Sequence, residues 1–272
     1  MSVDKRMGLV AGYGAFPLQL AKNLKDAGFY LHVVAIREEA CASIENIADS
    51  CTWLHVGQIA SLIKSMQQHD IKQLIFAGKV QKLHLFRNFR PDLLTAKILL
   101  QAKDKTDDAL MLGIVDALAK KSVFVRSQIE YAGEMLAGEG HLFGPKPNKQ
   151  MLKDMAFGFP QAKAIAGLDI GQTIVLKDEA VLAVEAIEGT DEAIRRGGLL
   201  GVKHCTVVKV AKPKQDPRFD VPAMGVGTLE TMAASGCTAI GIEAGQTLLI
   251  EAEQLAVVAK QLGICIMGIT QV

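Results

Sequence analysis

The 272-residue sequence predicts an α/β protein with an N-terminal Rossmann-like parallel-sheet domain and a C-terminal mixed α/β domain of less common topology. Three observations predict this class. Half of the residues are apolar, which is enough for a sizeable core. Short apolar runs alternate with segments of helical periodicity in the first half. A stretch rich in glycine and proline then interrupts the pattern near the middle of the chain.

The first half follows the order strand, helix, strand, helix. A short strand at Gly8–Ala11 runs into Gly12-Tyr13-Gly14, and apolar residues then recur at helical spacing as far as Gly28. Strands that alternate with helices in this way predict a parallel sheet with right-handed crossovers. Further strands are expected at 30–36, 52–56, 73–77 and 123–125, with helices at 59–66 and 106–120.

The break between the halves lies at 137–149, where glycine and proline are frequent. We expect domains at 1–135 and 146–272, joined by a linker at 136–145. In the second domain Thr190 is expected to cap a helix. Strands are expected there at 172–176, 180–187, 206–211, 239–242, 247–250 and 264–267, and helices at 190–196, 227–234 and 251–262.

Composition excludes several classes of protein. The 30 basic and 29 acidic residues, with 5% aromatics, argue against a dedicated nucleic-acid-binding protein. The five cysteines form no C-x-x-C pair, which favours reduced thiols in the cytoplasm. The six histidines do not fall at metal-ligand spacing with the cysteines, which argues against zinc. The sequence has no secretory signal and no apolar run of about 18 residues, so we expect a soluble cytoplasmic protein.

The first candidate site is the turn after the first strand, which contains Gly12, Gly14, Ala15 and Phe16. Two glycines let a backbone approach a phosphate, and the N-terminus of the next helix favours anions. The third glycine of a dinucleotide fingerprint is absent, with Pro17 in its place. Both a nucleotide diphosphate contact and a plain strand-to-helix turn therefore stay open.

The second candidate site is Gly78-Lys79, which follows an expected strand. The carboxyl end of a parallel strand is where α/β sheets bind ligands, and a lysine there suits phosphate. Residues 72–97 hold six cations against one acid, and leucine and phenylalanine alternate with them over 83–89. This pattern fits an anionic, apolar ligand or a membrane surface, or else a solvated basic loop.

The third candidate site is the segment 209–222, which follows a strand and contains three prolines. A stiff loop that carries charges of both signs could hold a metal and a phosphate together. Asp216 and Asp220 offer the hard oxygen ligands that Mg²⁺ prefers, and Lys212, Lys214 and Arg218 could neutralise phosphates. A solvated turn is the alternative.

The fourth candidate site lies between a strand and a helix and contains Glu188, Thr190 and Asp191. These residues could cap the helix, or they could form a polar cluster placed at a ligand by the strand end.

Four motifs together resemble one known family. They are G-Y-G-A-F-P at 12–17, G-K-V at 78–80 with R-N-F-R-P-D at 87–92, V-E-A-I-E-G-T-D-E-A-I-R-R-G-G at 184–198, and K-x-x-K-P-K-Q-D-P-R-F-D-V-P-A-M-G at 209–225. In this combination and order the chain resembles the LpxI family of UDP-2,3-diacylglucosamine pyrophosphatases, over essentially its whole length.

The resemblance implies Mg²⁺-dependent hydrolysis of UDP-2,3-diacylglucosamine to UMP and 2,3-diacylglucosamine 1-phosphate (lipid X), a step of lipid A biosynthesis. It also implies a homodimer. Because the substrate is acylated, peripheral contact of the protein with the inner membrane is an open alternative. The family's essential aspartate is assigned to Asp220 first and Asp216 second, and both are candidate metal ligands. The four candidate sites would then bind the substrate.

Two other classes of function compete with this interpretation. A nicotinamide-dependent oxidoreductase would need the missing third glycine and a ribose-binding acid. A non-catalytic carrier of nucleotides or lipids would bind its ligand without needing Mg²⁺. An RNA-binding role is disfavoured because the aromatic residues do not form a stacking set.

Overall fold

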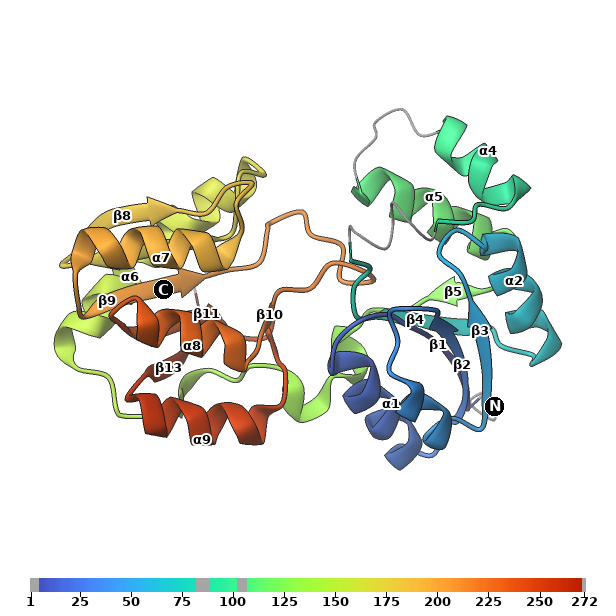
Figure 1. The fold of residues 1–272 in the computed structure, drawn as a ribbon, viewed down its shortest axis with the longest axis horizontal. Coiled ribbons are helices and arrows are strands. Elements are labelled where there is room, and N and C mark those ends of the chain that lie inside the picture. Colours follow the sequence, from blue (N-terminus) through green and yellow to red (C-terminus); the bar gives the residue numbers. More distant parts are fainter. Residues whose placement is uncertain (1–4, 82–88, 102–106, 271–272) are drawn as a thin grey trace. The chain divides into compact units, whose positions relative to one another are not determined.

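The computed structural model describes residues 5–81, 89–101 and 107–270, and the chain divides into two compact units (Figure 1). The first unit comprises Met1–Ala132 together with Pro217–Phe219, and the second comprises Gly133–Asp216 and Asp220–Val272. Each unit is built around its own sheet with helices packed on it, so the α/β class is confirmed.

The first unit has a five-stranded parallel sheet in the order β3-β2-β1-β4-β5. The order reverses between β1 and β4, and this is the switch point at which open parallel sheets bind ligands. The predicted parallel sheet is therefore confirmed. Its strands are β1 (Arg6–Ala11), β2 (Tyr30–Ile36), β3 (Ser50–Leu54), β4 (Gln73–Ala77) and β5 (Phe124–Val125).

The third strand lies two residues earlier than the predicted span 52–56. Thr52 and Trp53 are residue types that are frequent in strands, and the predicted span begins at Thr52. Its start is fixed instead by pairing with β2, in which Ser50 lies opposite His32.

Helices cover the sheet with their apolar sides. Helix α1 buries Phe16, Leu20 and Leu24, whereas α2 contributes Leu62 and Met66 to a core that also contains β-strand and α5 side chains. The described helices of this unit are α1 (Phe16–Asp26), α2 (Ile59–Gln68), α4 (Leu93–Gln101) and α5 (Asp107–Ala119), with short 3₁₀ turns at Ala42–Asn46 and Ile129–Tyr131.

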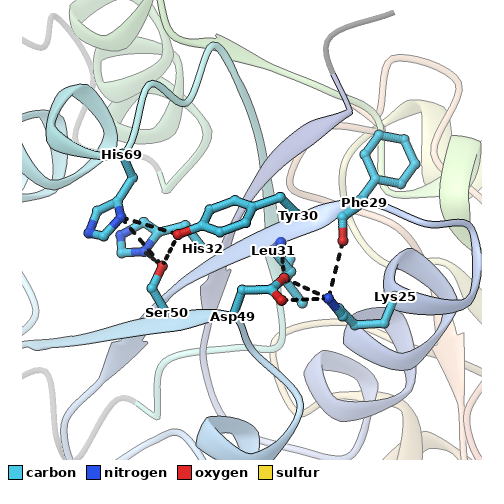
Figure 2. A network of polar contacts seen from close by, with 8 residues as sticks. All are labelled: Lys25, Phe29, Tyr30, Leu31, His32, Asp49, Ser50 and His69. Carbon is cyan, nitrogen blue, oxygen red and sulfur yellow. Dashed lines mark hydrogen bonds and ion pairs between the residues drawn. The ribbon is translucent and has the colours of Figure 1, made fainter.

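A polar network lies near the amino ends of β2 and β3 (Figure 2). His32 is fully buried, with its Nδ1 2.7 Å from the Ser50 hydroxyl and its Nε2 2.8 Å from the Ser65 hydroxyl. The ring of His69 stacks on it at a centroid distance of 3.9 Å. Burial, together with the nearby His69, lowers the pKa of His32 to about 4, so this imidazole is neutral at physiological pH.

The second unit has a six-stranded mixed sheet in the order β6-β13-β11-β9-β7-β8. Strands β9, β11 and β13 are parallel, whereas β6 and β7 run antiparallel to their neighbours. The strands are β6 (Gly140–Phe143), β7 (Thr173–Lys177), β8 (Ala180–Val184), β9 (Cys205–Lys209), β11 (Cys237–Glu243) and β13 (Cys265–Ile269), and a separate small pair joins β10 (Ala223–Met224) to β12 (Leu248–Leu249).

Strands β7 and β8, which correspond to the strands expected at 172–176 and 180–187, pair as an antiparallel hairpin. Its two turn residues, Asp178 and Glu179, have φ of 51° and 61°, as a tight two-residue turn requires. Strand β8 ends at Val184, three residues before the predicted end at Ile187, and Ile187 is fully exposed.

Helices pack on both faces of the second sheet. Met155 and Phe159 of α6 pack against Val208 on one face, and Ile194 of α7 and Leu229 of α8 pack against Val207 on the other. These helices are α6 (Lys149–Gly167), α7 (Thr190–Gly201), α8 (Val226–Ala234) and α9 (Ala252–Leu262).

The sequence did not predict helix α6. Gly158 and Pro160 interrupt its pattern in the middle and read as helix breakers. In the structure Gly158 is the point where α6 approaches the sheet, because a Cβ there would lie 2.9 Å from Leu176 and 3.0 Å from Val208. Asn148 caps the helix by accepting a hydrogen bond from the Met151 amide at 2.8 Å.

No helix in the described parts of the chain is long and apolar enough to cross a membrane.

Candidate functional site

In the first unit the turns that end β1 and β4 are joined by backbone hydrogen bonds. The Tyr13 amide donates to the Lys79 carbonyl at 2.7 Å, and the Lys79 amide donates back to Tyr13 at 3.2 Å. The Gly12 amide donates to the Ala77 carbonyl at 2.8 Å. The structure therefore brings the first two candidate sites together at the switch point of the sheet.

Glycine is required where these turns meet. A Cβ on Gly12 would lie 2.7 Å from the Lys79 carbonyl oxygen. Gly78 has φ of +82°, and a Cβ there would lie 2.7 Å from the Tyr13 carbonyl oxygen. These two glycines thus have a packing role, in addition to any role in ligand binding.

The amino end of α1 is open to a ligand. Ala15 occupies the N-cap position, and its methyl side chain cannot cap the helix. Gly14 is exposed with φ of +108°, and no heavy atom of the described residues lies within 4 Å of where its Cβ would be. Lys79 lies nearby, with its Nζ 6.0 Å from the centroid of the Tyr13 ring. An uncapped helix terminus beside a lysine can bind an anionic group such as a phosphate.

In the second unit a chain of polar side chains, two of them buried and one half-buried, lies at the carboxyl edge of the sheet. Lys209, the last residue of β9, donates from Nζ to the Thr190 hydroxyl at 3.1 Å. That hydroxyl donates to Glu185 Oε1 at 2.9 Å. Lys209 is 7% exposed and Glu185 is 8% exposed, so two opposite charges share one hydroxyl away from water. Burial of both charges is tolerable because each is hydrogen-bonded.

The prediction that Thr190 caps α7 is wrong. The N-cap is Gly189, which has φ of 86°, and Thr190 is the first residue of the helix. Its hydroxyl is engaged with Glu185 and Lys209 instead of a helix amide.

The other two residues predicted here have different surroundings. Glu188 pairs with Arg196 on the surface of α7 at 2.6 Å. Its own backbone amide and the Arg196 guanidinium lower the pKa of Glu188 below its usual value. Asp191 is exposed in the first turn of α7, where the helix dipole stabilises its negative charge. Only Thr190 joins the buried chain.

The loop after β9 carries the predicted acidic pair. The Asp220 amide donates to the Asp216 carbonyl at 3.0 Å, which closes a turn around Pro217–Phe219. Lys212 pairs with Asp169 at 2.6 Å, and Lys214 is exposed. Arg218 lies between the two aspartates in the sequence and groups with the first unit.

The acidic pair also bears on the metal prediction. Among the described residues, no group of three or more His, Cys, Asp and Glu side chains could hold a metal ion. Mg²⁺, however, usually takes one or two carboxylates and completes its shell with water and substrate phosphates. The two carboxylates of this loop fit that donor set.

The base of the same loop is held by an ion pair that the sequence analysis missed. Lys163 of α6 pairs with Glu243, the last residue of β11, at 3.0 Å. Glu243 accepts from the Ala211 amide at 2.7 Å, and Lys163 donates to the Ala211 carbonyl at 2.9 Å. Glu243 and Lys209 share a sequence signal, because each is a charged residue at the end of an apolar strand.

The interleaved basic and apolar segment 83–89 was another predicted ligand surface. Apart from Phe89, it lies outside the described residues. The ring of Phe89 packs close to Gly57, since a Cβ on Gly57 would lie 2.7 Å from it.

Comparison with solved structures gives weak matches. A nucleoside-diphosphate-sugar epimerase from Pseudomonas aeruginosa matches 93% of this chain and 86% of its own, at 12% identity and a TM-score of 0.30. Phosphoribosylglycinamide synthetase from Anaerococcus prevotii matches 70% of this chain and 34% of its own, at 12% identity and a TM-score of 0.25. Scores this low do not establish a shared fold.

Comparison of sequences gives a match over the whole chain. The family model for the LpxI N-terminal domain matches residues 6–135, and that for the LpxI C-terminal domain matches residues 138–267. A curated protein of Caulobacter vibrioides, UDP-2,3-diacylglucosamine pyrophosphatase LpxI, is 31% identical over 97% of this chain and 98% of its own length. These matches confirm the resemblance seen in the four motifs, and the chain belongs to the LpxI family.

Proposed function

We propose that this chain hydrolyses the pyrophosphate bond of UDP-2,3-diacylglucosamine to UMP and 2,3-diacylglucosamine 1-phosphate, as a step of lipid A biosynthesis. The observation that carries the proposal is the match to a curated pyrophosphatase along nearly the full length of both chains. The structure supports it with an open helix terminus at a sheet switch point in one unit and a charged loop in the other.

The reaction needs an activated water and a way to balance charge on the diphosphate. In this proposal Asp220 orients the attacking water or holds Mg²⁺, and Asp216 is the second candidate for each role. Mg²⁺, when bound by these carboxylates, would supply positive charge to the pyrophosphate oxygens. Lys212, Lys214 and Arg218 on the same loop would neutralise the phosphates as the bond breaks.

The remaining candidate residues would bind the substrate. The free backbone at Gly14, Ala15 and Phe16 suits a phosphate of the nucleotide, and Lys79 adds positive charge beside it. Gly12 and Gly78 shape that turn. At the carboxyl edge of the second sheet Thr190 would contact the substrate together with Glu188, which precedes α7, and Asp191, which lies in its first turn.

We propose that the chain forms a homodimer and that the carboxyl end of α7 lies in the interface between the two copies. Leu199, Leu200 and Val202 are 81%, 61% and 76% exposed and adjoin one another in the sequence. A cluster of exposed apolar side chains favours association with another protein surface. Light scattering should give twice the mass of one chain, and Leu199→Asp with Val202→Asp should reduce it to that of a monomer.

We also propose that α4 contacts the cytoplasmic face of an anionic membrane. Leu93 and Leu100 are 91% and 87% exposed, and Lys97 lies between them on the same side of the helix. Arg90, just before the helix, is exposed as well. Leucines flanked by cations suit a bilayer that contains anionic phospholipid, which is where a diacylated substrate resides.

Vesicle flotation tests this contact. The protein should float with vesicles that contain phosphatidylglycerol and remain in solution with pure phosphatidylcholine. Leu93→Gln with Leu100→Gln should abolish flotation, whereas Val257→Gln, at a 56% exposed valine of α9, should not change it. Equal flotation of the double variant and the unaltered chain would exclude α4 as the contact.

Incubation with UDP-2,3-diacylglucosamine tests the proposed reaction directly. Release of UMP should require the purified chain and Mg²⁺ and should stop when EDTA is added. UDP-glucose, which has the same diphosphate without the acyl chains, serves as the control for substrate recognition. Binding of the substrate without release of UMP would identify a carrier instead of a hydrolase, and turnover that EDTA does not affect would exclude the metal.

A further inference from the structure

We propose that Lys163 and Glu243 are positioning residues, which fix the loop of Asp216 and Asp220 by gripping the backbone of Ala211. The inference rests on the proposed function, because that function gives the loop its catalytic carboxylates. Neither residue needs to touch the substrate. Both act through a single peptide position five residues before Asp216.

Lys163 and Glu243 together bond both the amide and the carbonyl of Ala211. Glu243 Oε2 accepts from the Ala211 amide at 2.7 Å, and Lys163 Nζ donates to the Ala211 carbonyl at 2.9 Å. Lys163 also lies 3.0 Å from each carboxylate oxygen of Glu243, so the two side chains hold each other. Residues 163, 211 and 243 thus form a closed ring of hydrogen bonds between α6, the loop and β11.

The ring lies at the point where the chain leaves strand β9 and enters the loop. Strand β9 ends at Lys209, and the Val210 amide still donates to Gln172 at 2.9 Å. Ala211 is the first residue whose backbone is held by side chains instead of a neighbouring strand. The ring therefore sets the direction in which the chain leaves the sheet.

The loop can transmit that direction to its carboxylates. Pro213 and Pro217 restrict the backbone on either side of Asp216. The Lys212 amide donates to Gln215 at 2.9 Å, and the Asp220 amide donates to Asp216 at 3.0 Å. We infer that a loop stiffened in this way carries a rotation at Ala211 toward both aspartates, with Pro217, whose carbonyl accepts from the Gln128 amide at 2.9 Å, as a second fixed point.

The pair is more than is needed to satisfy one peptide. A carboxylate and an ammonium that are partly removed from water carry a desolvation penalty that a neutral pair would avoid. The side chains of Lys163 and Glu243 are only 24% and 14% exposed. An ion pair can offset this penalty by holding the backbone in a single geometry. A loop that orients two carboxylates needs such a fixed backbone.

Three variants test the inference. Lys163→Met leaves Glu243 holding the Ala211 amide, and Lys163→Arg keeps the cation. A charge swap, Lys163→Glu with Glu243→Lys, restores an ion pair but puts a cation against the Ala211 amide. We expect kcat to fall on the order of tenfold to a hundredfold in Lys163→Met and in the swap, with KM little changed. Lys163→Arg should recover most of kcat.

A matched control exists in the first unit (Figure 2). Lys25 pairs with Asp49 at 2.6 Å, and Asp49 accepts from the Leu31 amide at 2.7 Å, so a similar pair grips a backbone away from the loop. Lys25→Met should lower stability to a similar degree without changing kcat. Full recovery of kcat in the charge swap, or an equal loss of kcat in Lys25→Met, would overturn the positioning role.

A readout without substrate separates this inference from the proposed function. Trypsin can cut after Lys214 and Arg218, and we expect both cuts to be faster in Lys163→Met and in the swap than in the unaltered chain. In the swap, which replaces the Glu243 acceptor, the Ala211 amide should also exchange hydrogen faster. The unaltered chain could fail to hydrolyse the substrate while trypsin cutting and amide exchange still become faster in the variants. In that case the proposed function would be wrong, but the hydrogen bonds of Lys163 and Glu243 to Ala211 would still be shown to fix the loop. Unchanged cutting and exchange would overturn the grip itself.

Discussion

The Tyr13 amide donates to the Lys79 carbonyl at 2.7 Å, and this bond fastens the turn after β1 to the turn after β4. It therefore occupies a backbone donor that a dinucleotide-binding turn would offer to phosphate. The donors left for a ligand come from Gly14 to Phe16, at the uncapped start of α1. The glycines around this bond have two separate tasks, which substitutions can distinguish.

Gly78→Ala should destabilise the first unit strongly. Its φ of +82° is strained for alanine, and the new Cβ would lie 2.7 Å from the Tyr13 carbonyl oxygen. We expect the free energy of unfolding to fall by about 2–4 kcal/mol, since strain and overlap add. Urea denaturation measures this loss.

Gly28→Ala is the control for strain alone. Gly28 has φ of +80°, but among the described residues its Cβ would meet only the flexible end of Lys5, at 3.4 Å. Its loss should be about 1 kcal/mol. Equal losses at the two positions would show that the junction of the β1 and β4 turns yields to a methyl group.

Asp220→Asn should abolish turnover while the chain stays folded and still binds substrate. The change removes a charge and keeps the size of the side chain, so the turn formed by the Asp220 amide and the Asp216 carbonyl should persist. We expect kcat to fall on the order of a thousandfold or more, as for loss of an activating group. Single-turnover release of UMP provides the measurement.

Asp216→Asn, prepared in parallel, ranks the two aspartates. If Asp216 serves mainly as a metal ligand, raising Mg²⁺ should restore part of its activity, whereas Asp220→Asn should not respond. A wild-type rate in Asp220→Asn would reject the primary assignment.

His32 should make the first unit sensitive to acid. Its pKa is lowered to about 4 in the folded protein by burial first and then by His69, from 6.5 in an unfolded chain. Between these values the unfolded state binds the extra proton, so stability is complete above pH 6.5 and falls as the pH drops toward 4. The loss from this residue should reach up to about 3 kcal/mol.

His32→Gln should flatten that part of the pH profile, measured by urea denaturation from pH 7 to pH 4. His69→Gln should flatten it less, because burial, the larger cause, remains. An unchanged slope in His32→Gln would mean that another group controls acid stability.

The sequence predicted the parts of the fold that depend on local pattern. The apolar runs at 30–36 and 73–77 became β2 and β4 with their predicted bounds, because a strand buried on both faces is marked by its own residues. Helix α6 was missed because its Gly158 satisfies a tertiary contact with the sheet, which no local pattern encodes. The cap of α7 was misplaced for a similar reason, since distant residues hold the Thr190 hydroxyl.

The candidate site was predictable only in part. Lys79 and the 12–16 turn were identified because strand ends in a parallel sheet converge at one edge. Lys163 and Glu243 lie 80 residues apart, and their partner Ala211 has no functional side chain, so no sequence pattern indicated that the three residues are in contact. Contacts made through a backbone amide leave no mark on the identity of the residue.

Lys209, Thr190 and Glu185 should prove to be one energetic unit. Lys209→Met removes a buried cation that the Thr190 hydroxyl links to the Glu185 carboxylate, so we expect a loss of about 3–5 kcal/mol in the free energy of unfolding. Thr190→Val removes the linking hydroxyl with little change of shape and should lower it by about 1–3 kcal/mol.

A double-mutant cycle tests the coupling. The double variant should lose less than the sum of the single losses, by at least about 1 kcal/mol, because both changes break the same chain of hydrogen bonds. Arg196→Met, at an ion pair with Glu188 that is half exposed on the arginine side, provides the control and should cost less than about 1 kcal/mol. Strict additivity would show that Lys209 and Thr190 act separately, and the buried lysine would then need a different partner to explain its place at the end of β9.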